Sequence, residues 1–424
     1  MYNVKKIIDK TLKNEILYTK LDSGLNVYVV PQKSFKKTIG MFGTKFGSLD
    51  NEFKIDNITN KIPDGVAHFL EHKLFEQEDS NALDLFSKIG MNSNAYTSYD
   101  HTVYYFETTK DVDKGIKTLI NLVKTPYFTD ENVEKEKGII NQEISMYDDD
   151  PNWQGYMSIL KGLYKNHPIS IDIAGTSSSI SEIDKDVLYK CYNSFYNLNN
   201  MFFIVVGDVN PEQIIDLVNN EIKKYKNETP KNIVKILNEK KEDSSIKSIT
   251  KKMDVYMPII SFGYRLEPLK GIENLKRDIV ISIIESMYFS KLSNFYNEMY
   301  DKKILNSPID LSYESGKNYA FAILTVQSRE KKLIMDEISR YINQIISTKF
   351  DKELFEIIKR EKYGNLVYSY DNIDTFWKEV IQHELLDIPM FKALEVLESI
   401  NEDDVKNVCN EIFVKSKQFM SIIE

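Results

Sequence analysis

The sequence predicts an α+β protein made of two homologous domains. Its 424 residues are too many for one ordinary hydrophobic core, so at least two domains are expected. In the first half, short runs rich in Val, Tyr and Phe alternate with longer runs of helical apolar spacing. This alternation favours mixed α and β structure over an all-helical or all-β fold. The second half resembles the first when the two are laid over each other.

The composition, with 42% hydrophobic and 28% charged residues, is typical of a soluble globular protein. A formal net charge of -9 argues against a nucleic acid or an anionic membrane as partner. No apolar run approaches the length of a membrane span and the N-terminus has no apolar leader, so we expect a cytoplasmic protein. Cys191 and Cys409 lie far apart in the sequence, which predicts core thiols rather than disulfides or a thiolate metal site.

The first expected elements are strands that build a platform for a helix. Residues 16–18, 25–30 and 38–46 have the composition of strands, with a turn at 22–24. The tripeptide 63–65, Pro-Asp-Gly, then marks the start of a helix whose apolar spacing suits packing on a core.

This helix carries the pattern His68-x-x-Glu71-His72, the reverse of the commoner His-Glu-x-x-His. At about 100° per residue, the two histidines project from one face a turn apart, and Glu71 falls on the flank of that face. Two such imidazoles can bind one metal ion, and the carboxylate can reach an attacking water, as metal-assisted peptide hydrolysis requires. The alternative is two partly exposed helix histidines beside an ordinary surface glutamate. With only 5 His in the chain, two of them bracketing a glutamate is not expected by chance.

The alternation of helices and strands continues beyond the motif. Residues 81–89 predict a helix closed by Gly90, and residues 102–108 predict a strand. Residues 112–123 return to helical periodicity, which Pro126 breaks.

A third metal ligand is expected from the long helix predicted at residues 131–147. Glu136 and Glu143 stand two turns apart on it and so share one face. Two histidines and one carboxylate leave a fourth position open for water, which is the pattern of catalytic zinc. Spacing alone does not choose Glu143 over Glu136 or Glu134, and without the histidines these would be solvated surface glutamates.

The rest of the first half contains no further predicted ligand. His167 is interpreted as structural, a loop at 172–176 leads to a helix from about residue 181, and residues 201–206 predict a compact apolar strand. A final helix is expected at 212–225, after which the chain turns polar and charged. We therefore expect a first domain at 1–228, a linker at 229–248 and a second domain at 249–424.

The internal repeat is clearest where residues 128–137 lie without gaps over residues 350–359. In this register Glu143 falls on Asn365 and Glu136 on Ile358, and the only histidine of the second half is His383. The metal chemistry is therefore expected in the first copy alone. Similar composition of two amphipathic segments is the alternative. Two such copies facing each other would enclose a cavity that admits extended peptides and excludes folded proteins.

These features together resemble the pitrilysin/insulinase family of zinc metallopeptidases. The resemblance covers most of the first half and, more faintly, the second. It rests on four patterns: residues 65–72 (Gly-Val-Ala-His-Phe-Leu-Glu-His), residues 94–97 (Asn-Ala-Tyr-Thr), the pair Glu136 and Glu143, and Asn200-Met201 before a strand that ends in Gly207-Asp208.

The resemblance implies Zn²⁺ held by His68, His72 and Glu143. It implies Glu71 as the general base in attack on the scissile carbonyl, and Glu136 as a group that supports the ligands without binding the metal. The implied fold is two copies of a mostly antiparallel β-sheet covered by helices. The implied activity is that of an endopeptidase cutting peptides or unfolded segments in a cavity between domains or subunits.

The resemblance also implies a substrate strand. Asn94, Ala95, Tyr96 and Thr97 match the family's edge strand, where the substrate backbone pairs as an added β-strand. Because such pairing involves the main chain, selectivity for the substrate's sequence should be loose.

One departure concerns the second half, where the family often has an Arg and a Tyr seven residues apart that hold the substrate. Tyr300 and Ser307 occupy those places here. The chain is similar to a bacterial cytoplasmic subgroup of about this length, accompanied by a related subunit whose zinc motif is incomplete. A dimer, with such a partner supplying the missing groups, is therefore expected. A non-catalytic or weakly active peptide-binding subunit is the alternative function.

Overall fold

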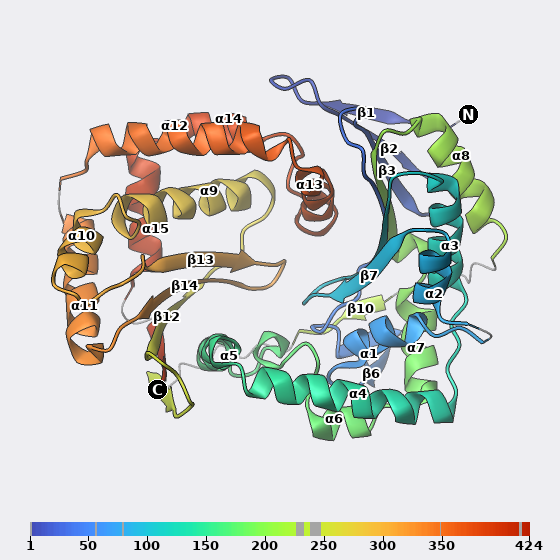
Figure 1. Cartoon of the computed structure of the whole chain (residues 1–424), viewed down its shortest axis with the longest axis horizontal. Coiled ribbons are helices and arrows are strands. Elements are labelled where there is room, and N and C mark those ends of the chain that lie inside the picture. Colours follow the sequence, from blue (N-terminus) through green and yellow to red (C-terminus); the bar gives the residue numbers. More distant parts are fainter. Residues whose placement is uncertain are drawn as a thin grey trace. The chain divides into compact units, whose positions relative to one another are not determined.

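The computed structural model describes residues 2–55, 57–78, 80–225, 233–237, 247–347, 349–414 and 418–424. The chain forms two compact units (Figure 1). Unit 1 comprises Met1–Ile144, Ile171–Leu237 and Asn372–Glu384, and unit 2 comprises Ser145–Ser170, Asn238–Asp371 and Leu385–Glu424. Most of the linker expected at 229–248 lies outside the described residues, so the domain limits remain a prediction.

Unit 1 is built on a seven-stranded sheet in the order β1-β2-β3-β9-β4-β8-β7. Its strands are β1 Lys5–Ile8, β2 Glu15–Lys20, β3 Asn26–Pro31, β9 Met201–Gly207, β4 Thr38–Thr44, β8 Thr102–Thr108 and β7 Asn92–Thr97. Only β3 and β9 pair in parallel, and the other neighbours are antiparallel. The expected α+β fold with mostly antiparallel sheets is confirmed.

The apolar composition of the central strands explains their position. Every residue of β4 and of β9 is buried, as expected for strands covered on both faces. Strand β7 is far more polar and lies at the edge, where it pairs with β8. The segment that the sequence identified as a substrate strand is therefore an edge strand.

Helices cover the sheet of unit 1, with α3 and α8 packed against one face (Figure 1). The helices are α1 Val66–Leu74, α2 Ala82–Lys88, α3 Val112–Lys124, α4 Asp130–Asp148, α6 Ser177–Ser181, α7 Lys185–Phe195 and α8 Pro211–Ile222. The helix expected from about residue 181 is in fact two: α6 ends there, and α7 begins after Asp184, whose side chain accepts from the Val187 N–H. A small sheet of β10 Ile233–Lys235, β5 Glu52–Ile55 and β6 Ile58–Lys61 was not expected.

On its other face, β3 is contacted by a helix from the second half of the chain, α13 Ile373–Leu386. Its Glu384 is buried and receives hydrogen bonds from Tyr28 and from Asn26 (2.9 Å), while the Lys45 ammonium lies 2.6 Å from its other oxygen. Side chains alternate between the faces of a strand, so Tyr28 points away from the core that Val27 helps to form.

Unit 2 contains a five-stranded sheet in the order β11-β15-β12-β14-β13. Its strands are β11 Ser248–Lys251, β15 Gln418–Ile423, β12 Ile259–Leu266, β14 Ala320–Gln327 and β13 Asp310–Ser315. Its helices are α5 Pro151–Leu163, α9 Gly271–Tyr288, α10 Asn294–Asp301, α11 Lys331–Ser347, α12 Lys352–Ser369, α14 Ala393–Ser399 and α15 Glu402–Ile412. Helix α5 packs on β12 and β15.

The two units repeat one topology. The order β3-β9-β4-β8-β7 corresponds to β11-β15-β12-β14-β13, and in both the first pair is parallel. Helices α4 and α12 begin at Asp130 and Lys352, and α5 and α13 begin at Pro151 and Ile373. Both pairs keep the offset that separates Phe128 from Phe350, so the repeat inferred from the sequence is a repeat of structure.

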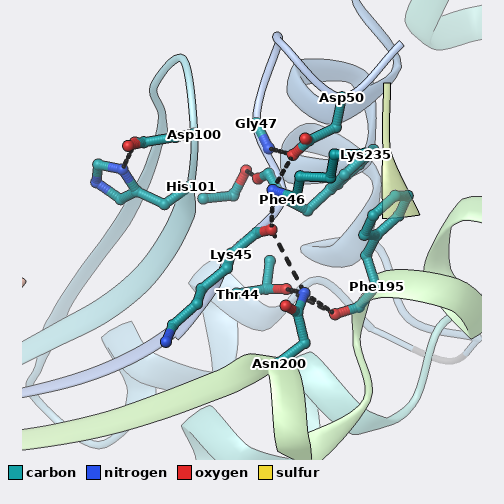
Figure 2. A network of polar contacts seen from close by, with 11 residues as sticks. Thr44, Lys45, Phe46, Gly47, Asp50, Asp100, His101, Phe195, Asn200 and Lys235 are labelled. Atoms are coloured by element: carbon teal, nitrogen blue, oxygen red, sulfur yellow. Dashed lines mark hydrogen bonds and ion pairs between the residues drawn. The ribbon is translucent and has the colours of Figure 1, made fainter. Parts of the chain in front are cut away.

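A network of polar contacts holds the loop that follows β4 (Figure 2). The Ser48 and Leu49 N–H groups donate to carbonyls of the turn between β7 and β8. In the same loop, buried Asp50 accepts from the Gly47 N–H (2.9 Å) and from Lys235 (2.8 Å). Burial raises the pKa of Asp50 despite the opposing effect of the Lys235 charge. The loop after β4 thus fixes the β7–β8 turn.

Gly47 allows this close approach, and its replacement gives a test of the packing. A Cβ at position 47 would lie 2.5 Å from the Ser98 carbonyl oxygen and 2.6 Å from the Asp100 and His101 nitrogens, all backbone atoms that cannot rotate away. We expect Gly47→Ala to destabilise the protein by about 1–3 kcal/mol, as other overpacking changes do. The measurement is the free energy of unfolding in denaturant.

The matched control is Gly138→Ala in α4, where an added Cβ meets nothing within 4 Å. Because alanine favours helix over glycine by roughly 0.5–1 kcal/mol, this variant should be as stable as the parent or slightly more so. Equal stability of the two variants would contradict the packing described for Gly47.

Candidate metal centre

Helix α1 presents its histidines because the rest of the helix is embedded in the core of unit 1. Phe69, Leu70 and Leu74 have no exposed surface and belong to that core. The helix begins after Gly65, whose φ of 89° lies in the left-handed region, and a Cβ there would be 2.5 Å from the Ala174 carbonyl oxygen. A glycine is therefore required at this position.

His68, His72 and Glu143 come together at one point. The Nε2 atoms of both histidines lie 3.6 Å from Oε2 of Glu143, and one donor atom from each of the three residues lies within 4.8 Å of the others. Ligand atoms about 2 Å from a tetrahedral ion are about 3.3 Å apart, so these donors need only small movements to bind one. Among the described residues this is the only such group of three or more His, Cys, Asp or Glu side chains.

Glu136 contacts the His72 imidazole through the ring nitrogen that does not face Glu143. Its Oε1 is 2.9 Å from Nδ1 of His72, and because a carboxylate can only accept, Nδ1 carries the hydrogen. The neutral imidazole then has its lone pair on Nε2, facing Glu143. Burial lowers the pKa of His72, but the Glu136 hydrogen bond and the surrounding carboxylates outweigh burial and raise it.

The two histidines differ in their surroundings. Burial and the neighbouring His72 lower the pKa of His68 to about 3, so its imidazole is neutral near pH 7. Its Nδ1 is buried without a hydrogen-bond partner among the described residues. Among the described residues, a carboxylate therefore contacts Nδ1 of His72 but not Nδ1 of His68.

Glu71 is buried beside the three donors but is not one of them. The Thr97 hydroxyl, at the end of β7, donates to its Oε2 at 2.7 Å. Burial raises the pKa of Glu71, against the opposing effects of the Thr97 hydrogen bond and the His72 charge. A carboxylate with a raised pKa accepts a proton more readily than an exposed one does.

The three glutamates of α4, between which spacing alone did not choose a metal ligand, have different surroundings in the structure. Glu143 lies near both Nε2 atoms and Glu136 contacts Nδ1 of His72. Glu134 is exposed and pairs with Lys137. The role of each residue in metal binding remains a prediction.

The structure places the predicted substrate residues along β7, but only one of their side chains reaches the centre. The Thr97 hydroxyl contacts Glu71, whereas the Tyr96 hydroxyl lies 3.3 Å from Nε2 of His101. The side-chain oxygen of Asn94 accepts from the N–H of Ala95 at 2.9 Å. The Thr97 contact joins strand and helix and was not expected from sequence.

Sequence reasoning also missed Lys73, which is fully buried next to His72 and lies 3.7 Å from Glu136. The available signal was its position within the apolar spacing of α1.

Tyr300 and Ser307, the two departures from the family pattern, lie in unit 2. Tyr300 is 54% exposed on α10, and Ser307 is exposed before β13. His167 also belongs to unit 2, where it is buried.

Within the described ranges, no helix is both long enough and apolar enough to cross a bilayer.

Comparison with known proteins gives consistent matches over most of the chain. The family model described as insulinase (peptidase family M16) matches residues 59–177, and that of the peptidase M16 inactive domain matches residues 182–362. A Bacillus subtilis protein named uncharacterized zinc protease YmfH is 37% identical over 417 residues, which are 96% of each chain.

Two solved structures have the same fold. An M16-like peptidase from Alicyclobacillus acidocaldarius superposes with a TM-score of 0.93 at 27% identity, covering 98% of this chain and 99% of that one. The periplasmic protease PqqL of Escherichia coli superposes with a TM-score of 0.79 at 17% identity, covering 99% of this chain but 48% of that one. Since the motif helix, the repeated units and the sequence of a full-length relative all agree, the chain belongs to the insulinase family, peptidase family M16.

Proposed function

We propose that this chain is a zinc-dependent endopeptidase that hydrolyses peptides or unfolded segments. The observation that carries the proposal is the convergence of His68, His72 and Glu143 next to the buried carboxylate of Glu71. Membership of a peptidase family and relatives named zinc proteases support it.

The donor set suits Zn²⁺. Two imidazole nitrogens and one carboxylate oxygen are ligands that zinc prefers, and three protein ligands leave one position of a tetrahedron for water or substrate. A zinc ion bound by these residues would polarise the scissile carbonyl and make the attacking water more acidic.

The residues around the donors then have separable tasks. Glu71 takes the proton of the attacking water, and the Thr97 hydroxyl holds one of its oxygens so that the other can accept. Glu136 keeps the hydrogen of His72 on Nδ1, which leaves Nε2 for the metal.

The substrate is an extended peptide that adds to β7 as a further strand. An edge strand offers main-chain donors and acceptors, which pair with the main chain of the substrate and not with its side chains. Selectivity for the substrate's sequence is therefore loose. Thr97 joins this strand to Glu71, so a peptide paired along β7 runs toward the base.

The working form is a dimer with a homologous subunit. The chain spans about half the length of PqqL. Tyr300 has no positive charge for a peptide carbonyl, and the Ser307 hydroxyl is shorter than the phenol often found there in the family. A partner with an intact Arg and Tyr would supply both groups. If no such partner restores activity, a non-catalytic or weakly active peptide-binding subunit is the alternative.

A cytoplasmic location fits the two cysteines. Both are buried free thiols, and burial raises the pKa of each to about 12, which suppresses the reactive thiolate. Nothing in the proposed chemistry uses them.

The first prediction concerns the metal. His72→Ala should abolish stoichiometric zinc binding, because it removes one of three ligands and the group that Glu136 holds. The measurement is zinc content after dialysis against a weak chelator. His383→Ala, which changes a histidine outside the centre, is the control and should keep one zinc per chain. Full zinc in His72→Ala would refute the ligand assignment.

The second prediction separates binding from catalysis. Glu71→Gln should keep zinc but lose peptide hydrolysis by on the order of 10²–10⁴-fold, because an amide cannot accept the proton of water. Glu134→Gln, an exposed change on α4, should leave the rate unaltered. An active Glu71→Gln enzyme would mean that another group is the base, with Glu136 the next to examine.

The third prediction concerns the partner. Activity against a mixed peptide pool should rise when this chain is mixed with a homologous subunit that has the Arg and Tyr pair. Installing the pair here, as Tyr300→Arg with Ser307→Tyr, should raise the activity of the isolated chain. Full activity of the unmodified chain alone, with no gain on mixing, would contradict the need for a partner.

A further inference from the structure

Lys73 is a charged side chain where an apolar one is expected. It follows His72 in α1 and has no exposed surface, although lysines are almost never fully buried unless paired. Its ammonium donates to Oε2 of Glu76 and lies 3.7 Å from Oε2 of Glu136. The buried charge is therefore compensated by two carboxylates, one of which belongs to the metal centre.

Glu136 is held by two consecutive residues of α1, one on each of its oxygens. Oε1 accepts from Nδ1 of His72 at 2.9 Å, and Oε2 faces Lys73. The charges of His72 and Lys73, with the His72 hydrogen bond, hold the pKa of Glu136 below its usual value although burial acts to raise it.

Stability alone does not explain a lysine at this position. Replacing a buried ion pair by well-packed apolar residues is often neutral or stabilising. The neighbours Phe69, Leu70 and Leu74 are fully buried apolar residues of the same helix. A methionine would suit such surroundings, so the ammonium points to a task at Glu136.

We infer that Lys73 is a positioning residue of the metal centre, which holds Glu136 so that His72 presents Nε2 to the ion. The inference rests on the proposed function, because it assigns His72 as a ligand. Lys73 acts through Glu136 and touches neither substrate nor metal.

The experiment measures the zinc dissociation constant by chelator competition in four proteins: the parent, Lys73→Met, Glu136→Gln and the double variant. Loss of a group that orients a ligand typically costs 10–100-fold in metal affinity. Lys73→Met should weaken zinc binding by roughly 10-fold. If it acts through Glu136, the double variant should bind zinc no more weakly than Glu136→Gln does.

A second readout needs no metal. With ¹⁵N-labelled histidine, the chain gives signals from only 5 imidazoles. In the metal-free parent, at a pH high enough to keep the imidazole neutral, His72 should show the tautomer with hydrogen on Nδ1. In Lys73→Met, that signal should shift toward a mixture of tautomers, which a role in general packing would not produce.

Lys137→Met is the matched control, because it removes an ion pair of the same spacing, with Glu134, from the helix that carries Glu136. It should change neither zinc affinity nor the His72 signal. If Lys73→Met does not fold, Lys73→Gln, which keeps a donor without the charge, is measured against the same criteria.

Three results would overturn the inference: an unchanged dissociation constant in the Lys73 variant, losses that multiply in the double variant, or an unaltered His72 tautomer. Failure of the parent to bind zinc would instead reject the proposed function. The metal-free spectra would then still decide whether Lys73 orients His72.

Discussion

The carboxylate of Glu136 joins the two helices that carry the metal-centre residues. Helix α1 is fixed by burial, since eight of its nine residues are buried. Helix α4 is mostly polar, and only Asn132, Val133, Ile140 and Ile144 are buried along its 19 residues. Contact between Glu136 and His72 therefore adds to a small apolar interface in setting the distance between the helices. Glu143, two turns further along, depends on that distance for its approach to both Nε2 atoms.

The surroundings of Glu71 and Glu136 shift the pKa values of these two carboxylates in opposite directions. Burial dominates at Glu71 and raises its pKa, whereas at Glu136 the charges and hydrogen bond of α1 overcome burial and lower it. Groups whose environments push their pKa values apart are suited to different tasks. Here the first carboxylate is disposed to accept a proton and the second to remain an anion that holds an imidazole.

Much of this arrangement could be predicted from the sequence, because it depends on local spacing. The pattern of His68, Glu71 and His72 places both histidines on one helix face with Glu71 on its flank, and the repeat offset located α4 and α12. Spacing did not separate Glu136 from Glu143, since residues seven apart share a face and only docking against α1 distinguishes them. The contacts of Thr97 and Lys73 were missed because they depend on tertiary packing. Strands β5, β6 and β10 are short and carry polar residues, so they lack a clear strand pattern.

The repeated helices α5 and α13 have exchanged places. Each stands at the same point of its repeat, yet α5 packs in the unit built mainly from the second half of the chain, and most of α13 belongs to the unit built mainly from the first. Neither half of the sequence therefore folds into one unit by itself. A fragment ending near the middle of the chain would lack α13 and would contain α5 without the unit on which it packs. In a domain-swapped homodimer, each subunit packs one of its helices on the other subunit. Fusion of two such genes into one would produce the exchange of α5 and α13 seen here.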